Sequence, residues 1–166
     1  MAIRPAQLTA RLYALARLQN WTISANFPSQ LKPGDSITGT ITVTNPDTAS
    51  HDVTVHVIPQ WDTTKETTAT KTIAAGQSAT YNFPADFAPA ANLPLLMPNK
   101  QAVLTITATI VVDTTPQTVA QTTVTINVPF YYQQICIGTF CIPVWMLLAG
   151  AAFLVIIGVA ATRKKK

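Results

Sequence analysis

The stretch from Gly34 to Asn45, GDSITGTITVTN, decides the fold class, because its apolar and hydroxyl side chains alternate residue by residue. The odd positions Ile37, Gly39, Ile41 and Val43 share one face, and the threonines between them share the other. A period of two is that of a β-strand, in which successive side chains point to opposite sides. We therefore predict a strand here with one buried and one exposed face.

The same alternation recurs on both sides of this stretch, between Asn20 and Phe130, with Gly, Pro, Asn and Asp in the gaps. The further strands that we predict lie at 21–27, 53–57, 67–73, 79–83, 104–110 and 124–128. About seven short strands in about 110 residues are typical of an Ig-like antiparallel β-sandwich. We expect two sheets with Trp21 and Trp61 in the core between them.

Two segments of this β region, LKPGDSITGTITVTNPDTASHDVTVHV from Leu31 and IAAGQSATYNF from Ile73, resemble the CARDB and NEW3 type of Ig-like module of bacterial and archaeal envelope proteins. In those modules a Pro-Gly-Asp turn, as at 33–35, leads into a Gly-x-Ile-x-Val-x-Asn strand. Gly39, Ile41, Val43 and Asn45 match that strand, and Gly76 matches a later turn. The resemblance covers residues 20 to 128 and implies adhesion or spacing without naming a ligand.

A run without charged residues, from Ile142 to Thr162, stands near the C-terminus. As a helix it would reach about 31 Å, the thickness of the hydrocarbon core of a bilayer. We predict a single transmembrane helix with Pro143 in its first turn, where helices tolerate proline. The predicted anchor residues are Trp145, Leu147, Leu148, Phe153, Leu154, Ile156 and Ile157, followed by the basic residues Arg163, Lys164, Lys165 and Lys166.

The formal net charge of +4 comes entirely from this basic tail, because residues 1 to 134 carry seven basic and seven acidic side chains. The charge is therefore no sign of sequence-specific nucleic-acid binding. Positively charged flanks usually stay inside, so we expect the tail inside and the β domain outside a cell membrane. In a virus with an internal membrane, the tail would face the packaged genome.

The first twenty residues contain no uninterrupted apolar core of a secretory signal, since Arg4, Gln7, Arg11 and Arg17 interrupt them. Residues 5–19 are rich in Leu, Ala and Arg and predict a short helix that packs on the domain or a neighbouring chain, or else lies on a membrane surface. The expected organisation is an N-terminal helix (1–19), a β-sandwich (20–130), a juxtamembrane segment (131–141), a transmembrane helix (142–162) and a basic tail (163–166).

Two features indicate contacts with neighbours. Only fourteen of the first 134 residues are charged, against about a quarter in ordinary soluble domains. The hydroxyl and amide surface that replaces them suits packing in an array, although threonine is also simply a good residue for the exposed side of a strand. The second feature is a proline-rich loop with Leu93, Leu95, Leu96 and Met97, which we expect either to cap the sandwich or to contact a partner.

No pattern in the sequence predicts catalysis, a cofactor, a metal site or a small-molecule substrate. His51 and Asp52 are adjacent, but a Gly-x-Ser-x-Gly nucleophile turn is absent. His51 and His56 are five apart on a strand, so we expect them on opposite faces, where they cannot share a metal ion. Cys136 and Cys141 are spaced to close a small disulfide loop or to remain two thiols, depending on the compartment.

These features favour a non-enzymatic, single-pass membrane protein in which the β-sandwich makes lateral or capsid-like contacts, in a membrane-containing virion or an envelope layer. The expected partners are the lipid bilayer and further copies of the chain or neighbouring structural proteins. A cell-surface adhesion or binding module is the first alternative, and an accessory subunit of a membrane complex is the second.

Overall fold

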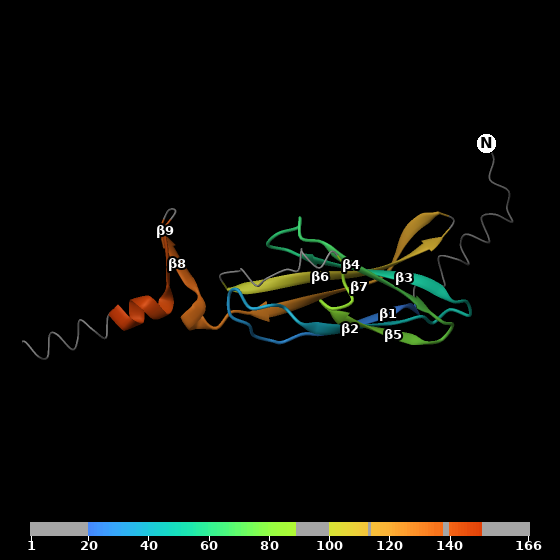
Figure 1. The fold of residues 1–166 in the computed structure, drawn as a ribbon, viewed down its shortest axis with the longest axis horizontal. Coiled ribbons are helices and arrows are strands. Elements are labelled where there is room, and N and C mark those ends of the chain that lie inside the picture. The colour runs from blue at the N-terminus through green and yellow to red at the C-terminus, as the bar shows by residue number, and fades with distance from the viewer. Residues whose placement is uncertain (1–19, 89–99, 113, 138–139, 151–166) are drawn as a thin grey trace, which may run out of the picture.

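The computed structural model of the chain describes residues 20–88, 100–112, 114–137 and 140–150 (Figure 1). A three-stranded sheet has the order β1-β2-β5, with β1 Thr22–Asn26, β2 Gly39–Thr44 and β5 Ser78–Phe83. A four-stranded sheet has the order β4-β3-β6-β7, with β3 His51–Pro59, β4 Thr67–Ile73, β6 Gln101–Val112 and β7 Thr115–Asn127. Every pair in both sheets is antiparallel, which confirms the prediction of a mainly β protein with two packed antiparallel sheets.

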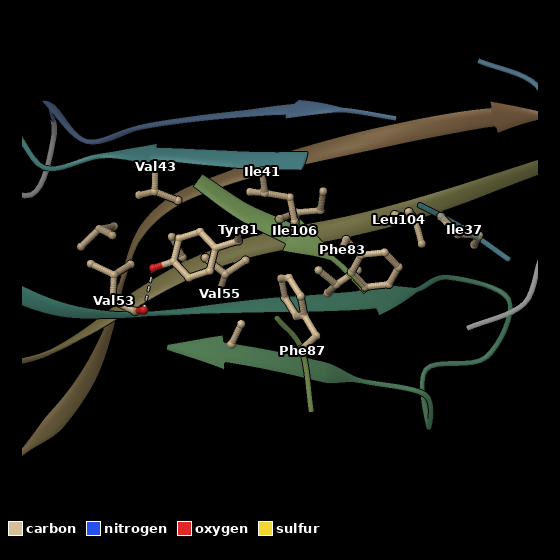
Figure 2. Packing of buried hydrophobic residues seen from close by; sticks show 14 of the residues in the cluster. Ile37, Ile41, Val43, Val53, Val55, Tyr81, Phe83, Phe87, Leu104 and Ile106 are labelled. Carbon is tan, nitrogen blue, oxygen red and sulfur yellow. Dashed lines mark hydrogen bonds between the residues drawn. The ribbon is translucent and has the colours of Figure 1, made fainter. Parts of the chain in front are cut away.

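The core lies between these two sheets and is built from the alternate residues of their strands (Figure 2). Ile41 and Val43, from the strand predicted within Gly34–Asn45, are both fully buried. The inward residues predicted for β6 are buried as well: Leu104, Ile106, Ala108 and Ile110. Trp21 is buried, whereas Trp61 is only partly buried and packs against the edge of the core.

Gly39 is required because two segments of the first sheet approach each other closely there. A Cβ atom at this position would lie 2.5 Å from Cδ1 of Phe27 and 2.7 Å from the backbone oxygen of Asn26. The Phe27 ring is held in place by Phe83, whose ring centroid is 5.7 Å away. Any larger side chain at position 39 would therefore displace both an aromatic ring and the backbone.

Asn45 joins the two sheets at the end of the sandwich where β2 terminates. Its side chain is fully buried, and Nδ2 donates to the carbonyl oxygens of Ala49 (2.8 Å), Ile73 (3.0 Å) and Ala74 (3.2 Å). Its Oδ1 accepts a hydrogen bond of 2.9 Å from the amide of Asp47. The turn after β2 and the turn after β4 are thus held by one amide group, which supplies a physical reason for the asparagine at this position.

Lys71 links the two sheets along one long edge of the sandwich. The edge strands there are β4 of the four-stranded sheet and β5 of the three-stranded sheet. Its Nζ donates to the carbonyl oxygen of Thr80 on β5 and to Oδ2 of Asp86, both at 2.7 Å. The hydrogen bond from Lys71 lowers the pKa of Asp86 below its ordinary value. Ala88 continues the closure, because it exchanges two backbone hydrogen bonds with Thr68.

Tyr81 is fully buried, and its hydroxyl lies between the two sheets. The side chain stands on β5, and its hydroxyl donates to the carbonyl oxygen of Val53 on β3 at 2.9 Å (Figure 2). Its ring also lies 6.4 Å from that of Phe87, centroid to centroid. Burial raises the pKa of Tyr81 to about 12, because the charged phenolate would lose its hydration there.

Replacing Tyr81 with Phe should lower the free energy of unfolding by about 1 kcal/mol at neutral pH, because the hydroxyl is lost and its carbonyl partner stays buried. The difference should vanish near pH 11. The unfolded tyrosine ionises near its ordinary value of about 10, whereas the folded one keeps its proton up to about 12. The wild-type protein therefore keeps its full advantage below pH 10 and loses it as the pH rises. Urea unfolding of both proteins at pH 7 and pH 11 measures this, and a constant difference would contradict the assignment.

The hairpin of β6 and β7 is longer than predicted. The sequence analysis placed the last strand at 124–128, whereas β7 begins at Thr115 and ends at Asn127. A shift in register at Ala108 and Thr109 reverses which side of β7 faces inward, so that Val119 is buried as well as Ile126. A bulge of this kind interrupts the period-two pattern, so the alternation of side chains did not predict the first half of β7.

The C-terminal part of the described chain corrects a second prediction. A short helix, η3 Phe130–Tyr132, and a two-stranded sheet of β8 Gln134–Ile137 and β9 Phe140–Pro143 occupy the predicted juxtamembrane segment (131–141) and the residues next to it. Ile142 and Pro143 belong to β9, so the helix begins at residue 144 and not at Ile142. Pro143 ends the strand opposite Gln134, at a strand end where a missing amide hydrogen is tolerated.

Several predicted segments lie outside the described residues. They are the N-terminal helix (1–19), most of the apolar loop including Leu93, Leu95, Leu96 and Met97, the transmembrane helix from residue 151 onward, and the basic tail. In the part of the chain that the structure describes, no helix has the length and apolar character needed to cross a membrane.

Candidate interaction surfaces

Exposed apolar side chains are concentrated in one part of the molecule. Of the nine large apolar residues that are exposed among the described residues, eight lie between Phe130 and Leu148, and Val111 is the ninth. We call the described residues 130–137 and 140–148 the C-terminal apolar segment. Its exposed members are Phe130, Tyr131, Ile135, Ile137, Trp145, Met146, Leu147 and Leu148. An apolar surface of this density normally has a partner.

This segment stands beyond the end of the two sheets, at the left of Figure 1. The connection to the sandwich runs through η3, where Nε2 of Gln133 donates to the carbonyl oxygen of Val128 at 3.1 Å. Lys32, from the loop before β2, places its ammonium 5.1 Å from the centroid of the Tyr132 ring. The hydrogen bond with Tyr132 raises the pKa of Lys32, so this cation stays charged beside the aromatic ring.

The cysteines of the segment are joined to each other. Cys136 on β8 stands directly opposite Cys141 on β9, and the structure links them in a disulfide with their Cα atoms 4.0 Å apart. The bond closes a loop of six residues and holds the two short strands together. Of the two alternatives that the sequence left open, a disulfide or two free thiols, the structure contains the disulfide.

The predicted anchor residues divide into two groups. Trp145, Leu147 and Leu148 lie in the helical residues 144–150 and are exposed. The amide of Val144, at the start of this helix, donates to the carbonyl oxygen of Gln133 at 2.8 Å and so ties the helix to the base of the β8–β9 hairpin. The other predicted anchor residues, Phe153, Leu154, Ile156, Ile157 and Arg163 to Lys166, lie outside the described residues.

A second surface is the outer face of the three-stranded sheet. The register aligns its outward residues into three rows across the strands. These rows are Thr22, Thr44 and Ser78; Ser24, Thr42 and Thr80; and Asn26, Thr40 and Asn82. We call these nine residues the hydroxyl-amide grid. All nine side chains are uncharged and polar, and hydrogen bonds join Thr44 to Ser78 at 2.8 Å and Thr42 to Thr80 at 3.3 Å.

The outer face of the four-stranded sheet differs from the grid because it carries ionisable groups. Asp52 lies on β3 and accepts a hydrogen bond from the Thr72 hydroxyl. His56 lies further along the same strand, with Nδ1 at 2.7 Å from Oε1 of Glu66 and Nε2 at 3.2 Å from the Thr109 hydroxyl. The nine outward side chains of β1, β2 and β5 are thus neutral, with the Asp86 carboxylate at their edge beside Asn82. The four-stranded sheet instead carries ionisable side chains on the strands themselves.

The order of hydroxyl, imidazole and carboxylate around His56 is one that catalytic sites also use. The Thr109 hydroxyl, however, also donates to the carbonyl oxygen of Thr54 at 3.3 Å, so its proton is directed at the backbone of the neighbouring strand. We assign no reaction to this network. Sequence analysis missed it because Glu66 stands ten residues from His56, in a loop whose course only the folded chain defines.

The predicted relation of the two histidines is confirmed, since they lie on opposite faces of β3. His51 is on the inward side, where Nε2 lies 3.1 Å from Oδ2 of Asp47 and the ring stacks edge-on with Trp21. Its partner is thus Asp47 and not the adjacent Asp52. In the described ranges, no group of three or more His, Cys, Asp or Glu side chains is arranged to hold a metal ion.

A scan of the chain against protein-family models finds no match, and a search of curated proteins finds none either.

Proposed function

We propose that this chain is a non-enzymatic structural protein, anchored in a membrane by one C-terminal helix, whose β-sandwich makes lateral or capsid-like contacts in a membrane-containing virion or an envelope layer. One observation carries the proposal: the C-terminal apolar segment exposes eight large apolar side chains and continues directly into the uncharged sequence up to Thr162. Such a surface is costly in water and favourable against lipid.

We further propose that the sandwich is Ig-like. The strand order supports this, because β2 and β5 pair within one sheet while β3, β6 and β7 form the other, as the corresponding strands of Ig domains do. In constant-type Ig domains the fourth strand joins the first sheet, whereas β4 here pairs with β3. The adhesion or spacing role of the CARDB and NEW3 modules is implied only by the resemblance of sequence. The strand order is compatible with that resemblance.

The hydroxyl-amide grid is the surface that we assign to lateral contacts. Covering Thr, Ser and Asn side chains costs less desolvation than covering Lys or Glu, and a neutral face meets a second copy of itself without repulsion between like charges. The four-stranded sheet is less suited to this role, because Asp52, His56 and Glu66 lie on or beside its outer face. The proposal therefore places the contact on the three-stranded sheet.

Changing Thr42 and Thr80 to Glu together should disrupt lateral assembly, because two carboxylates would enter a covered neutral surface and face those of the next copy. Cross-linking of the full chain in native membranes should then give about tenfold fewer oligomers than wild type. The melting temperature should change by only a few degrees, since both threonines lie on the outer face of their strands.

A matched control is available on the other sheet. Thr54 and Thr70 form the same kind of cross-strand hydroxyl pair, with their oxygens 2.8 Å apart. The double change to Glu at Thr54 and Thr70 should leave the oligomers at the wild-type level. Equal loss in both variants, or none in either, would show that the grid is not the contact.

A further inference from the structure

The β8–β9 hairpin has one apolar face, on which Ile135 and Ile137 are exposed and Ile142 is partly buried. Residues paired across antiparallel strands share a face, so Ile135 and its partner Ile142 lie on the same side as Ile137. The other side carries the disulfide of Cys136 and Cys141. All four residues of β8 are exposed, and Ile137, next to the tip, has 82 % of its surface accessible.

A two-stranded hairpin alone in water is at best marginally stable, and an exposed apolar face adds to the cost. A partner for the face must be apolar. In the described ranges β8 and β9 form a sheet of two strands, so each has an outer edge, and the hydrocarbon core of a bilayer cannot hydrate the backbone groups of such an edge. The depth that suits both requirements is the interfacial region of a membrane, where water and headgroups reach the backbone while the isoleucines contact acyl chains.

We infer that the Ile135–Ile137–Ile142 face of the hairpin lies in the interfacial region of the bilayer, beside the point where the C-terminal helix enters. This inference rests on the proposed membrane anchor. It goes beyond that anchor because it assigns a second, non-helical membrane contact to the part of the chain between the sandwich and the helix.

The length and composition of the chain beyond the described residues argue for lipid as the occupant. From Thr114 to Thr162 the sequence contains no charged residue, and the first charges after it are the four basic residues at the end. The hydrogen bond from Val144 to Gln133 joins the start of the helix to the base of the hairpin. A helix that enters the bilayer from residue 144 therefore brings the hairpin to the membrane surface. Phe130, Tyr131 and Trp145, all exposed, are of the residue types that concentrate at that depth.

The test uses the full chain reconstituted into phosphatidylcholine vesicles, with and without bromine atoms on the acyl chains, which quench nearby tryptophan fluorescence. The variant Ile137→Trp adds a reporter next to the hairpin tip, and Ile135→Trp adds one on the same face. The matched control Thr80→Trp adds one on the hydroxyl-amide grid. After subtraction of the wild-type signal from the native tryptophans, the reporters at 137 and 135 should lose about half of their emission in brominated vesicles, and the reporter at 80 should lose none.

The outcomes separate the inference from the anchor on which it rests. If the protein floats with the vesicles and both hairpin reporters are quenched, the inference holds. If it floats but neither reporter is quenched, the hairpin is in water or against another copy, and the inference is overturned while the anchor stands. If the chain does not float with the vesicles at all, the anchor itself is wrong and the inference falls with it.

Discussion

Ending the chain after Pro129 should move the protein from the membrane fraction to the soluble fraction. The shortened chain lacks the C-terminal apolar segment and the uncharged run to Thr162, which together carry the proposed membrane contact. It keeps the whole hydrophobic core, because every buried residue of that core lies between Trp21 and Val128. Ultracentrifugation of cell lysates should find the full chain in the pellet after a high-salt wash and the shortened chain in the supernatant.

The shortened domain should also be folded, with a melting temperature within about 5 °C of the full chain, since Tyr132 is the one described residue after Pro129 that packs against the core, and it is only partly buried. A chain that ends after Val144 is the informative intermediate, because it retains the β8–β9 hairpin without the rest of the helix. We expect it to bind vesicles weakly and reversibly. Sedimentation of the chain ending at Pro129 with washed membranes would show that the sandwich itself binds them, and the assignment of the anchor would be wrong.

Replacing Asn45 with Ala should lower the free energy of unfolding by about 3 to 5 kcal/mol, the largest effect that we expect from one polar side chain here. The change removes one amide group that serves three carbonyl oxygens and one backbone amide. Those groups lie at the end of the sandwich where the turns after β2 and β4 meet, and the buried ones would lose their partner without gaining water. Chemical denaturation of the domain measures the loss.

The change of Asn45 to Asp should cost more than the change to Ala. A carboxylate has nearly the shape of the amide, but it would direct negative charge at the carbonyl oxygens of Ala49, Ile73 and Ala74 in a buried site. The change of Asn26 to Ala is the control, because that asparagine is exposed on β1, and it should alter stability by less than about 0.5 kcal/mol. An Asp variant as stable as the Ala variant would mean that the amide donors contribute little.

Much of the sandwich could be predicted from short segments of sequence. The alternation in β2 and β6 was sufficient to identify Ile41, Val43, Leu104 and Ile106 as core residues, and all of them are buried. The same reasoning failed to predict the first half of β7, because the bulge in the β6–β7 hairpin adds one residue and so reverses which side of the strand faces inward. The β8–β9 hairpin was missed for a different reason: its residues are apolar on one face and lie next to a long apolar run, so the pattern resembles the beginning of a membrane helix.

The candidate surfaces were only partly visible in the sequence. The shortage of charge and the abundance of threonine predicted a neutral surface somewhere on the β domain. Only the pairing of β1, β2 and β5 shows that nine of these residues align in three rows on one sheet, while Asp52 and His56 lie on the other. Likewise, the two cysteines were recognised as a possible pair, but their opposition in the hairpin depends on the register of β8 and β9.

Features that depend on neighbouring residues could be predicted before the structure was known: which segments are strands, which of their sides is apolar, and where charge is absent near the C-terminus. Side-chain alternation and hydrophobicity act over a few residues and can be read directly from the chain. Other features became known only from the folded chain: which strands pair, that β4 joins β3, that Lys71 links β4 to β5 and that Asn45 joins two turns. These contacts link residues up to tens of positions apart, and their energies exist only once the two sheets have packed.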